Sequence, residues 1–342
     1  MKPPRVVFLF TNPREEVISR IRAGRDADTS LWGFNHIPHA EYLVASPTSL
    51  WSLRLVPRLL SYDFIVAQDC FLLGYIVSFC ARIFRRRTRW LYVTVTSSTL
   101  IRRHRAHPMR LFLLKKFWAS YARIICISSE QREDLIQLGI ARERLVFIPF
   151  GVDANFFQPT DTSSEDDLVM SVGRDAGRDY ATLFGAAERT NHKFVIVAGR
   201  SNIPADRQIP PNVTVLYNRS LFEIRDLYAR AKLAAVASKS VNVPDGSDCS
   251  GQTAILDALA AGKAVIATRR PWITDYFVPN EDLVVVEPND PETLARAIDS
   301  LSTDTEKRKL LSASGHTKVA KNYTTTIFAN ALYSLMNSYG ND

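Results

Sequence analysis

A run of small and polar residues stands directly before an alanine- and leucine-rich segment that we expect to form a helix. The side chains nearest to the start of that helix are Asp248, Cys249, Ser250, Gly251, Gln252 and Thr253. The first N–H groups of a helix have no acceptor within it, and its amino-terminal end carries partial positive charge. Small side chains let an anion or sugar hydroxyls approach this backbone, so we consider the segment a candidate site for a phosphorylated ligand.

One carboxylate in the expected helix also needs a chemical explanation. Asp257 lies one turn beyond Thr253 on the same face, between Leu256 and Ala258. A carboxylate among apolar residues is costly unless donors meet it, and the hydroxyls of a ribose would be suitable donors. The alternative is an ordinary capped helix with a polar loop and a structural carboxylate. Gly262 suits the position just after the helix.

Two arginines follow another expected strand, Leu168–Val172. Arg174 and Arg178 stand on either side of a glycine turn, and the planar guanidinium group has donors spaced to bind phosphate oxygens. At the carboxyl end of a strand, two such groups would suit a diphosphate. The spacing equally allows a pair of surface salt bridges with Asp175 and Asp179.

Several other kinds of site are excluded by their missing motifs. The sequence has no GxxxxGK[ST] loop, no HExxH, no GxSxG and no CxxC. A hydride-transfer site would need GxGxxG after the first strand, where Thr11-Asn12-Pro13-Arg14 stands instead. The four cysteines have no metal-ligand or disulfide-framework spacing, which favours a reducing compartment and thus a cytoplasmic protein.

The charge is distributed unevenly along the 342 residues. Residues 1–150 hold 23 of the 43 Lys and Arg residues but only 11 of the 35 Asp and Glu residues. This half should therefore meet something anionic: nucleic acid, an anionic membrane surface or an acidic acceptor. Basic clusters at 82–89 and 102–116 lie beside apolar and aromatic residues, as in a helix that docks on an anionic membrane. The alternatives are a core-packing helix with a solvated basic face, and nucleic-acid binding, which no recognition motif supports. The most apolar stretch, 71–84, is too short to span a bilayer.

Short β-branched runs alternate with helical patterns throughout the chain, which indicates parallel sheets covered by helices on both faces. The expected strands are Val6–Phe10, Tyr42–Ala45, Phe64–Ala67, Trp90–Thr94, Ile124–Ile127, Leu145–Ile148, Leu168–Val172, Lys193–Val197, Val213–Tyr217, Leu233–Ala237, Ala264–Thr268 and Leu283–Val286. The length favours two domains, which we expect at 1–155 and 165–325, with a final helix at 326–342 whose packing partner the sequence does not indicate. Two doubly wound domains would bind ligands at the carboxyl ends of their strands, in the cleft between them.

Several segments, in this order, resemble the family 4 glycosyltransferases (glycosyl transferases group 1). They are Cys126–Glu130, Leu145–Asp153, Ser171–Arg174 with Arg178, Asp226–Ala231, Gly251–Val265 and Leu283–Ile298. The resemblance implies the GT-B fold, an α/β architecture of two Rossmann-like doubly wound domains facing each other across a cleft, with the acceptor on the basic first domain. It implies an enzyme that moves a sugar from a nucleotide-diphosphate sugar to a glycan or glycolipid acceptor, with retention at the anomeric carbon. It implies no required metal and no cofactor beyond this donor substrate.

The resemblance also assigns roles to residues. Arg174 and Arg178 would hold the diphosphate and assist its departure, and Asp257 would bind the ribose hydroxyls. Gly173 and the loop 248–253 would contact phosphate or sugar. The family's first motif glutamate falls on Cys249, so Asp248, or Ser250 with Gln252, would have to bind the sugar hydroxyls instead. This departure leaves two rivals: a non-catalytic GT-B module that binds a nucleotide or sugar, and a GT-B nucleotide-sugar epimerase.

Overall fold

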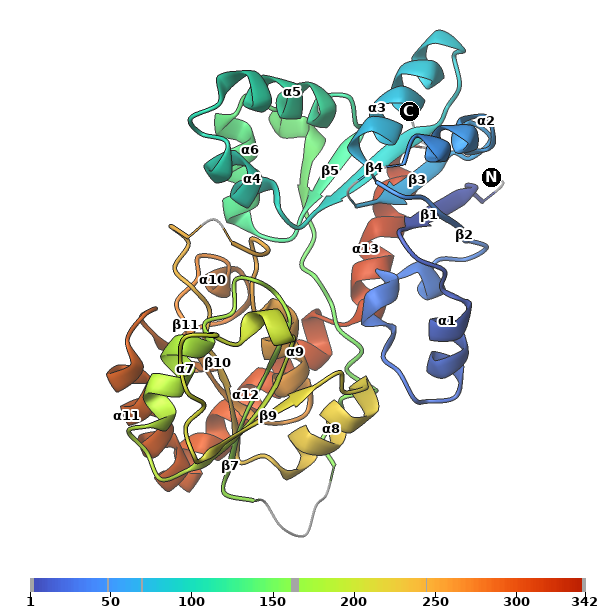
Figure 1. The fold of residues 1–342 in the computed structure, drawn as a ribbon. Coiled ribbons are helices and arrows are strands. Elements are labelled where there is room, and N and C mark those ends of the chain that lie inside the picture. Colours follow the sequence, from blue (N-terminus) through green and yellow to red (C-terminus); the bar gives the residue numbers. More distant parts are fainter. Residues whose placement is uncertain (1–2, 48, 69, 161–165, 244, 340–342) are drawn as a thin grey trace. The chain divides into compact units, whose positions relative to one another are not determined.

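The computed structural model describes residues 3–47, 49–68, 70–160, 166–243 and 245–339 (Figure 1). The chain divides into two compact units, each built on one six-stranded sheet. The first unit consists of Met1–Arg20, Ser30–Phe150 and Thr325–Asp342, and the second of Ile21–Thr29 and Gly151–Thr324. In the part of the chain that the model describes, no helix is both long enough and apolar enough to cross a bilayer.

The sheet of the first unit is entirely parallel, in the order β2-β1-β3-β4-β5-β6. Its strands are β1 (Val6–Phe10), β2 (Glu41–Val44), β3 (Phe64–Ala67), β4 (Arg89–Thr94), β5 (Arg123–Cys126) and β6 (Leu145–Phe147). Phe8 of β1 pairs with Tyr42 on one side and with Val66 on the other. The winding of the sheet therefore reverses between β1 and β3, which is where such sheets bind ligands.

The helices of the first unit cover this sheet, and the last of them comes from the far end of the chain. They are α1 (Glu15–Arg22), α2 (Val56–Leu59), α3 (Phe71–Ile83), α4 (Ser97–Arg103), α5 (Pro108–Trp118), α6 (Ser129–Gln137) and α13 (Thr325–Ser338), with short 3-10 helices η2 (Phe34–His36), η3 (Leu50–Leu55) and η4 (Arg142–Arg144). The end of α1 and the start of the 3-10 helix η1 (Asp28–Leu31) belong to the second unit. The α13 helix, red in Figure 1, belongs to this unit because its Phe328 packs edge-on against Trp32 and Phe150.

The sheet of the second unit is also parallel, in the order β12-β11-β10-β7-β8-β9. Its strands are β7 (Leu168–Gly173), β8 (Lys193–Ala198), β9 (Val213–Tyr217), β10 (Leu233–Val236), β11 (Ala264–Thr268) and β12 (Val284–Val286). Its helices are α7 (Tyr180–Ala187), η5 (Arg200–Asn202), α8 (Leu221–Arg230), α9 (Gln252–Ala260), α10 (Ile273–Tyr276), α11 (Pro291–Thr303) and α12 (Thr305–Asn322). Here the winding reverses between β7 and β10.

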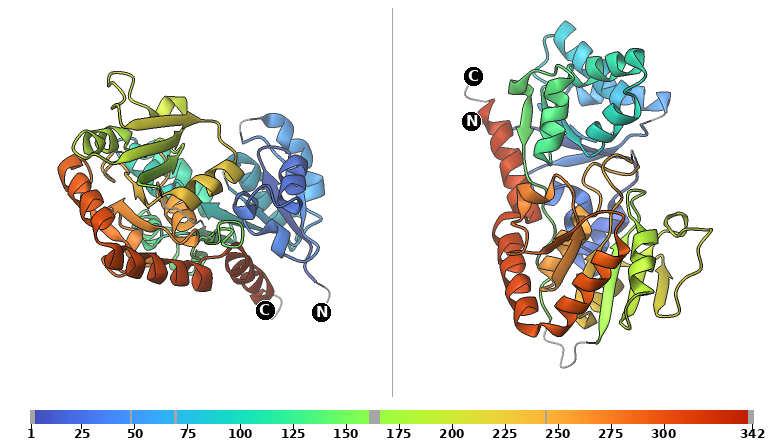
Figure 2. Two further views of the ribbon diagram at one scale, coloured as in Figure 1. Left: turned by 90° about the horizontal axis from the view of Figure 1, so that it is seen from below. Right: turned by 90° about the vertical axis from the view of Figure 1, so that its left-hand side faces the viewer.

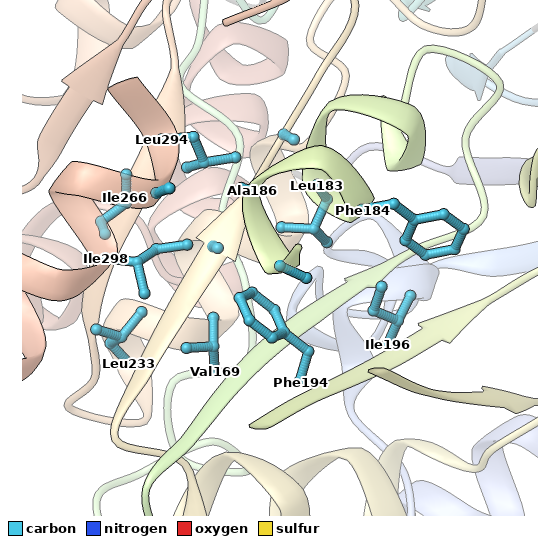
Figure 3. Packing of buried hydrophobic residues seen from close by; sticks show 14 of the residues in the cluster. Val169, Leu183, Phe184, Ala186, Phe194, Ile196, Leu233, Ile266, Leu294 and Ile298 are labelled. Carbon is cyan, nitrogen blue, oxygen red and sulfur yellow. The ribbon is translucent and has the colours of Figure 1, made fainter. Parts of the chain in front are cut away.

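Alternate strand residues of the second sheet form one face of its core. Val169, Phe194 and Leu233 pack there against Leu183 of α7 and Ile298 of α11 (Figure 3). The helices α8 and α9 contact β7 but contribute nothing to this cluster, so the sheet is covered on both faces. The neighbouring helices α11 and α12, orange to red, run side by side in the right-hand view of Figure 2. Burial on both faces explains why these strands are almost continuously apolar.

All twelve strands expected from the sequence are present, each end lying within one residue of its expected place. The helix α5 begins at Pro108 and ends at Trp118. Proline is favoured in the first turn of a helix because its missing N–H has no acceptor there in any case. As expected, Gly262 follows α9 in the left-handed conformation, with φ +70°.

Candidate functional site

The candidate residues of the second unit gather where its winding reverses, at the carboxyl ends of β7 and β10. The segment after β7 runs beside the segment after β10 and forms an isolated antiparallel bridge between Arg178 and Ser238. The N–H of Asp179 donates to the carbonyl of Ala237 at 3.0 Å, and the N–H of Lys239 donates to the carbonyl of Gly177 at 2.8 Å. These bonds fix the arginine-bearing loop against the neighbouring strand end.

The side chain of Arg178 lies against two glycines from different motifs. A β-carbon on Gly173 would stand 2.7 Å from Nε of Arg178, and a β-carbon on Gly251 would stand 2.8 Å from its Nη1. Real β-carbons essentially never approach other heavy atoms so closely. Glycine at both positions therefore leaves the space that the guanidinium group occupies, and the two motifs identified in the sequence meet at this arginine.

The guanidinium of Arg178 is buried with most of its hydrogen-bonding capacity unused. Only 2% of the residue is exposed, and its Nη2 donates to Oγ of Ser171 at 3.1 Å. Within the described residues, neither Nε nor Nη1 has a hydrogen-bond partner, and no carboxylate pairs with the group. The guanidinium carbon lies 5.7 Å from the centre of the Tyr180 ring. A buried, unpaired cation is costly, so this arrangement suits a site that receives an anion.

Arg174 is placed differently, although it stands only four residues earlier. Its side chain is exposed, and its Nη2 donates to the backbone carbonyl of Arg219 at 3.3 Å. Because an exposed guanidinium keeps its hydration, its electrostatic effect on a bound anion is weaker than that of a buried one. The two arginines therefore differ in strength as candidate phosphate ligands.

The salt bridges considered as an alternative are wrong, because Asp175 and Asp179 are engaged elsewhere. Asp179 caps α7: its carboxylate accepts from the N–H of Thr182 at 2.9 Å and from its hydroxyl at 2.6 Å. Asp175 accepts from the N–H groups of Gly177 at 2.8 Å and Ser247 at 2.9 Å. Both carboxylates thus shape the backbone around the site instead of neutralising the arginines.

The amino-terminal end of α9 lies beside Arg178. Gly251 stands at the cap with φ +84°, a left-handed conformation that favours glycine. The N–H of Gln252 donates to the carbonyl of Cys249. The hydrogen bonds of the helix then begin with the N–H of Ile255, which donates to the carbonyl of Gly251. Thr253 is exposed in the first turn. The end of the helix therefore presents N–H groups and the partial positive charge that favours anions.

In the loop before α9 and at the start of that helix, one buried polar atom has a hydrogen-bond partner and two others have none among the described residues. Asp248 and Cys249 are buried, and the carbonyl of Asp248 accepts from Nη2 of Arg270 at 2.8 Å. Ser250 and Gln252 are buried as well, but Oγ of Ser250 and Nε2 of Gln252 have no hydrogen-bond partner among the described residues. Such groups cost free energy unless a ligand or water meets them.

Arg270 and Ser238 are structural members of the site that the sequence analysis did not identify. Buried Arg270 donates from Nη1 to the carbonyl of Lys239 at 2.8 Å and so ties the two ends of the loop together. The Ser238 hydroxyl donates to the carbonyl of Ser250 at 3.3 Å. Both residues stand within two positions of an expected strand's end, which is the signal that would have marked them.

Asp257 is buried in α9, with 8% of the residue exposed. Its Oδ1 has no hydrogen-bond partner in the described part of the chain. Burial, and secondarily the charge of Asp153, raise the pKa of the Asp257 carboxyl well above its ordinary value. Burial, and secondarily the charge of Asp257, raise the pKa of Tyr228. A carboxyl in this state gains stability when hydroxyl donors reach it.

Comparisons with known proteins identify the family and the fold. The family model described as "Glycosyl transferases group 1" matches residues 154–318, and that described as "Glycosyl transferase 4-like domain" matches residues 5–151. No curated protein sequence matches this chain.

Solved structures of the same fold cover nearly the whole chain. HepE of Anabaena, in complex with UDP and glucose, has a TM-score of 0.74 at 18% identity and covers 98% of this chain and 100% of its own. Sucrose-phosphate synthase of Thermosynechococcus elongatus has a TM-score of 0.71 at 16% identity and covers 99% of each chain. A glycosyltransferase of Rickettsia africae has a TM-score of 0.71 at 13% identity, again covering 99% of each chain.

The two matched family models and the two parallel sheets define a glycosyltransferase of GT-B fold. The chain belongs to the family 4 glycosyltransferases, the glycosyl transferases group 1. This membership supports a glycosyltransferase over the two rivals, the non-catalytic module and the epimerase.

Proposed function

We propose that this glycosyltransferase moves a sugar from a nucleotide-diphosphate sugar to a glycan or glycolipid acceptor, with retention at the anomeric carbon and without a required metal. The observation that carries the proposal is the buried guanidinium of Arg178, whose Nε and Nη1 have no hydrogen-bond partner among the described residues. Its Nη1 lies against Gly251, the glycine cap of α9. A diphosphate would neutralise the buried charge and also receive the N–H groups of the helix end. The structure of HepE with UDP-glucose supports a donor of this class.

Each candidate residue has a role in this proposal. Arg178 binds the diphosphate from the buried side, and Arg174 binds it from the solvent side. Gly173 leaves room for the side chain of Arg178 and for the diphosphate. Gly251 and Thr253 offer backbone N–H groups to phosphate or sugar. Asp257 accepts hydrogen bonds from the ribose hydroxyls, which would give its Oδ1 the partner that it lacks among the described residues.

The chemical step follows from these positions. The bond between the anomeric carbon and the diphosphate oxygen breaks, and its electron pair goes to the diphosphate. The acceptor hydroxyl attacks the same face of the carbon, and its proton passes to the departing phosphate oxygen. Arg178 stabilises the negative charge as it develops, because a buried, fixed cation acts in a low-dielectric site without having to reorganise.

The donor sugar is bound by a set of groups without the usual carboxylate. Asp248 and Cys249 are buried, and Asp248 also holds the loop through Arg270. We therefore assign the sugar hydroxyls to Ser250 and Gln252, whose buried Oγ and Nε2 have no partner among the described residues. Asp248 and Cys249 then position these two side chains.

A product assay tests the whole proposal. Purified protein is incubated with a panel of nucleotide-diphosphate sugars and mixed glycan and glycolipid acceptors, and released nucleotide and product anomers are followed by NMR. We expect transfer with retention in the wild type and a loss of about 10²-fold or more in Arg178→Ala. Wild-type rates in both Arg178→Ala and Asp257→Ala would overturn the assignment.

We also propose that the first unit docks on an anionic membrane surface. Leu72, Tyr75, Phe79 and Ile83 are exposed and, at this spacing, share one face of α3. The neighbouring α5 adds exposed Met109, Phe112 and Leu113, and Tyr75 packs on Phe117 of that helix at 5.6 Å. Basic residues border both helices, at 82–89 and 102–116. An apolar stripe with cationic edges suits insertion between acidic headgroups.

A cytoplasmic location belongs to the same proposal. It is supported by the four cysteines, whose spacing in the sequence is not that of a disulfide framework. Thiols of this kind persist in reducing compartments.

A further inference from the structure

The first unit contains a pocket that the donor site does not use. It lies at the carboxyl ends of β1 and β3, the place where the winding of this sheet reverses. Aromatic Phe8, Phe10 and Trp32 form much of its wall, and Arg14 and Gln68 provide polar groups. Open α/β sheets bind ligands at such reversals, so the position by itself marks a binding pocket.

Among the described residues that line this pocket, Arg14 is the one with a charged side chain, and no described carboxylate pairs with it. Its guanidinium carbon lies 4.6 Å over the ring of Phe10. Its Nε is buried and has no hydrogen-bond partner within the described residues, and no carboxylate there pairs with it. Burial also lowers the pKa of this guanidinium. Phe10 therefore fixes the direction of the group without satisfying its donors.

The nearest carboxylates along the chain are both engaged elsewhere. Glu15 accepts a hydrogen bond from the hydroxyl of Tyr42, and Glu16 forms an ion pair with Arg20 one turn along α1. Because these two side chains already have partners, the charge of Arg14 remains free to meet an anion in the pocket.

Trp32 is held at the pocket in a backbone conformation that is costly for its type. Its φ is +53°, in the left-handed region. The ring packs on Phe150 at 4.7 Å and near Phe328 at 6.3 Å. The next residue, Gly33, approaches α13 so closely that a β-carbon would lie 2.8 Å from that of Ala329. Strain that the surroundings enforce in this way is typical of binding sites.

We propose that this pocket binds the acceptor, and that the acceptor sugar carries a carboxylate or phosphate group that Arg14 binds while its ring packs against Trp32. The planar fork of a guanidinium matches both of these anions, and an indole ring offers an apolar face to the C–H side of a sugar. Gln68 is half-buried in the lining and serves the sugar hydroxyls. This inference rests on the proposed function, since it names the chemical class of the acceptor.

Ligand-observed NMR with three matched probes tests the inference. The probes are methyl glucoside, methyl glucuronide and glucose 6-phosphate, which are neutral, carboxylated and phosphorylated. We expect at least one anionic probe to bind more tightly than the neutral one, and the preferred anion identifies the class of acceptor. Arg14→Gln should weaken that binding about tenfold or more, since a charged hydrogen bond is lost. Equal binding of all three probes, or unchanged binding by Arg14→Gln, would overturn the inference.

Two further variants serve as controls. Arg20→Gln removes a charge from α1, the helix that directly follows Arg14, and should bind the anionic probe as the wild type does. Arg178→Gln should also bind the anionic probe as the wild type does. If Arg178→Gln loses that binding and Arg14→Gln keeps it, the anion binds in the second unit and the inference is wrong. Titration with a nucleoside diphosphate separates the two proposals. A protein that binds the anionic sugar through Arg14 but no nucleotide would sink the proposed function and leave the pocket assignment standing.

Discussion

Nη1 of Arg178 lies 2.8 Å from the point that a β-carbon on Gly251 would occupy. The two residues are 73 positions apart in the sequence and come from separate motifs. The position of the Arg178 guanidinium nevertheless depends on the absence of a side chain at Gly251. Gly251 must lack a side chain for the guanidinium to lie against the helix end, and the guanidinium adds a full charge to the partial charge already present there.

Replacing Gly251 by alanine should therefore damage the site beyond the cost of the backbone. The left-handed φ costs about 1 kcal/mol for any residue with a β-carbon, and the new methyl group would also displace Arg178. We expect Gly251→Ala to lose nucleoside diphosphate binding by tenfold or more. The control is Gly24→Ala, at φ +66° with no atom within 4 Å of its β-carbon. In denaturant unfolding, Gly24→Ala should lose only the stability that the left-handed backbone costs. If Gly251→Ala binds the nucleotide with wild-type affinity, Arg178 does not depend on the glycine at this position.

The raised pKa of Asp257 predicts a pH-dependent stability. In the folded protein the carboxyl holds its proton to a higher pH than in the unfolded chain. Folding therefore takes up a proton, and the free energy of unfolding falls as pH rises from the unfolded pKa, about 3.9, toward the folded pKa. Asp257→Asn should remove this decline and be more stable than the wild type at neutral pH. Asp226→Asn, at an exposed carboxylate of α8, should follow the wild-type profile.

The same carboxyl should couple nucleotide binding to proton release. Ribose hydroxyls that donate to Asp257 favour its ionised form, so the complex should release protons and tighten as pH rises through the titration of Asp257. Calorimetry in buffers of different ionisation enthalpy measures that release. Asp257→Asn should release fewer protons and bind the nucleotide about tenfold more weakly. Equal proton release by variant and wild type would show that the ribose does not reach this group.

Gln252 should distinguish the donor sugar from the nucleotide. Because its Nε2 is assigned to sugar hydroxyls, Gln252→Leu should weaken binding of the nucleotide-diphosphate sugar about fivefold to tenfold and leave the nucleoside diphosphate nearly unchanged. Cys249→Ala, which removes a positioning side chain from the same buried loop, should show the same selective loss to a smaller extent. If Gln252→Leu lowers the two affinities equally, the side chain does not contact the sugar.

The apolar stripe of α3 should determine membrane association. The double variant Phe79→Ser/Ile83→Ser removes two side chains that are 53% and 58% exposed, so its folded core should be little affected. We expect it to lose most co-sedimentation with vesicles of phosphatidylcholine and phosphatidylglycerol. Leu310→Ser, at an exposed leucine of α12, should pellet as the wild type does. Raising the salt concentration should weaken pelleting, because screening reduces the attraction of the basic residues. Pelleting that neither salt nor the double variant changes would contradict this surface.

Most of the fold could be predicted from the sequence because its strands are buried on both faces. Such strands appear as short, continuously apolar runs, which is why Val6–Phe10 and Ala264–Thr268 are found at their expected residues. The place of α13 could not be predicted in this way. It depends on the contacts of Phe328 with Trp32 and Phe150, which are almost 300 and 180 positions away in the sequence.

The site was predictable in its residue types and less so in its geometry. The spacing of Arg174 and Arg178 suggested equal roles, whereas one side chain is exposed and the other is buried. Burial depends on which backbone passes nearby, here that of Gly173 and Gly251, and a local pattern does not contain that information. The position of Arg270, two residues after an expected strand, could have marked it as a candidate, but its partners are backbone carbonyls of a distant loop and only the structure shows them.

The central claim is that Arg178 holds the diphosphate of the donor. It is tested most directly by calorimetry with a nucleoside diphosphate and the corresponding monophosphate, using whichever of uridine, guanosine and adenosine binds best. The comparison is between the wild type, Arg178→Gln and Arg296→Gln, an exposed arginine of α11 paired with Glu292. The account predicts that the wild type and Arg296→Gln prefer the diphosphate by tenfold or more, and that Arg178→Gln loses this preference. An Arg178→Gln protein that keeps the wild-type preference would contradict it.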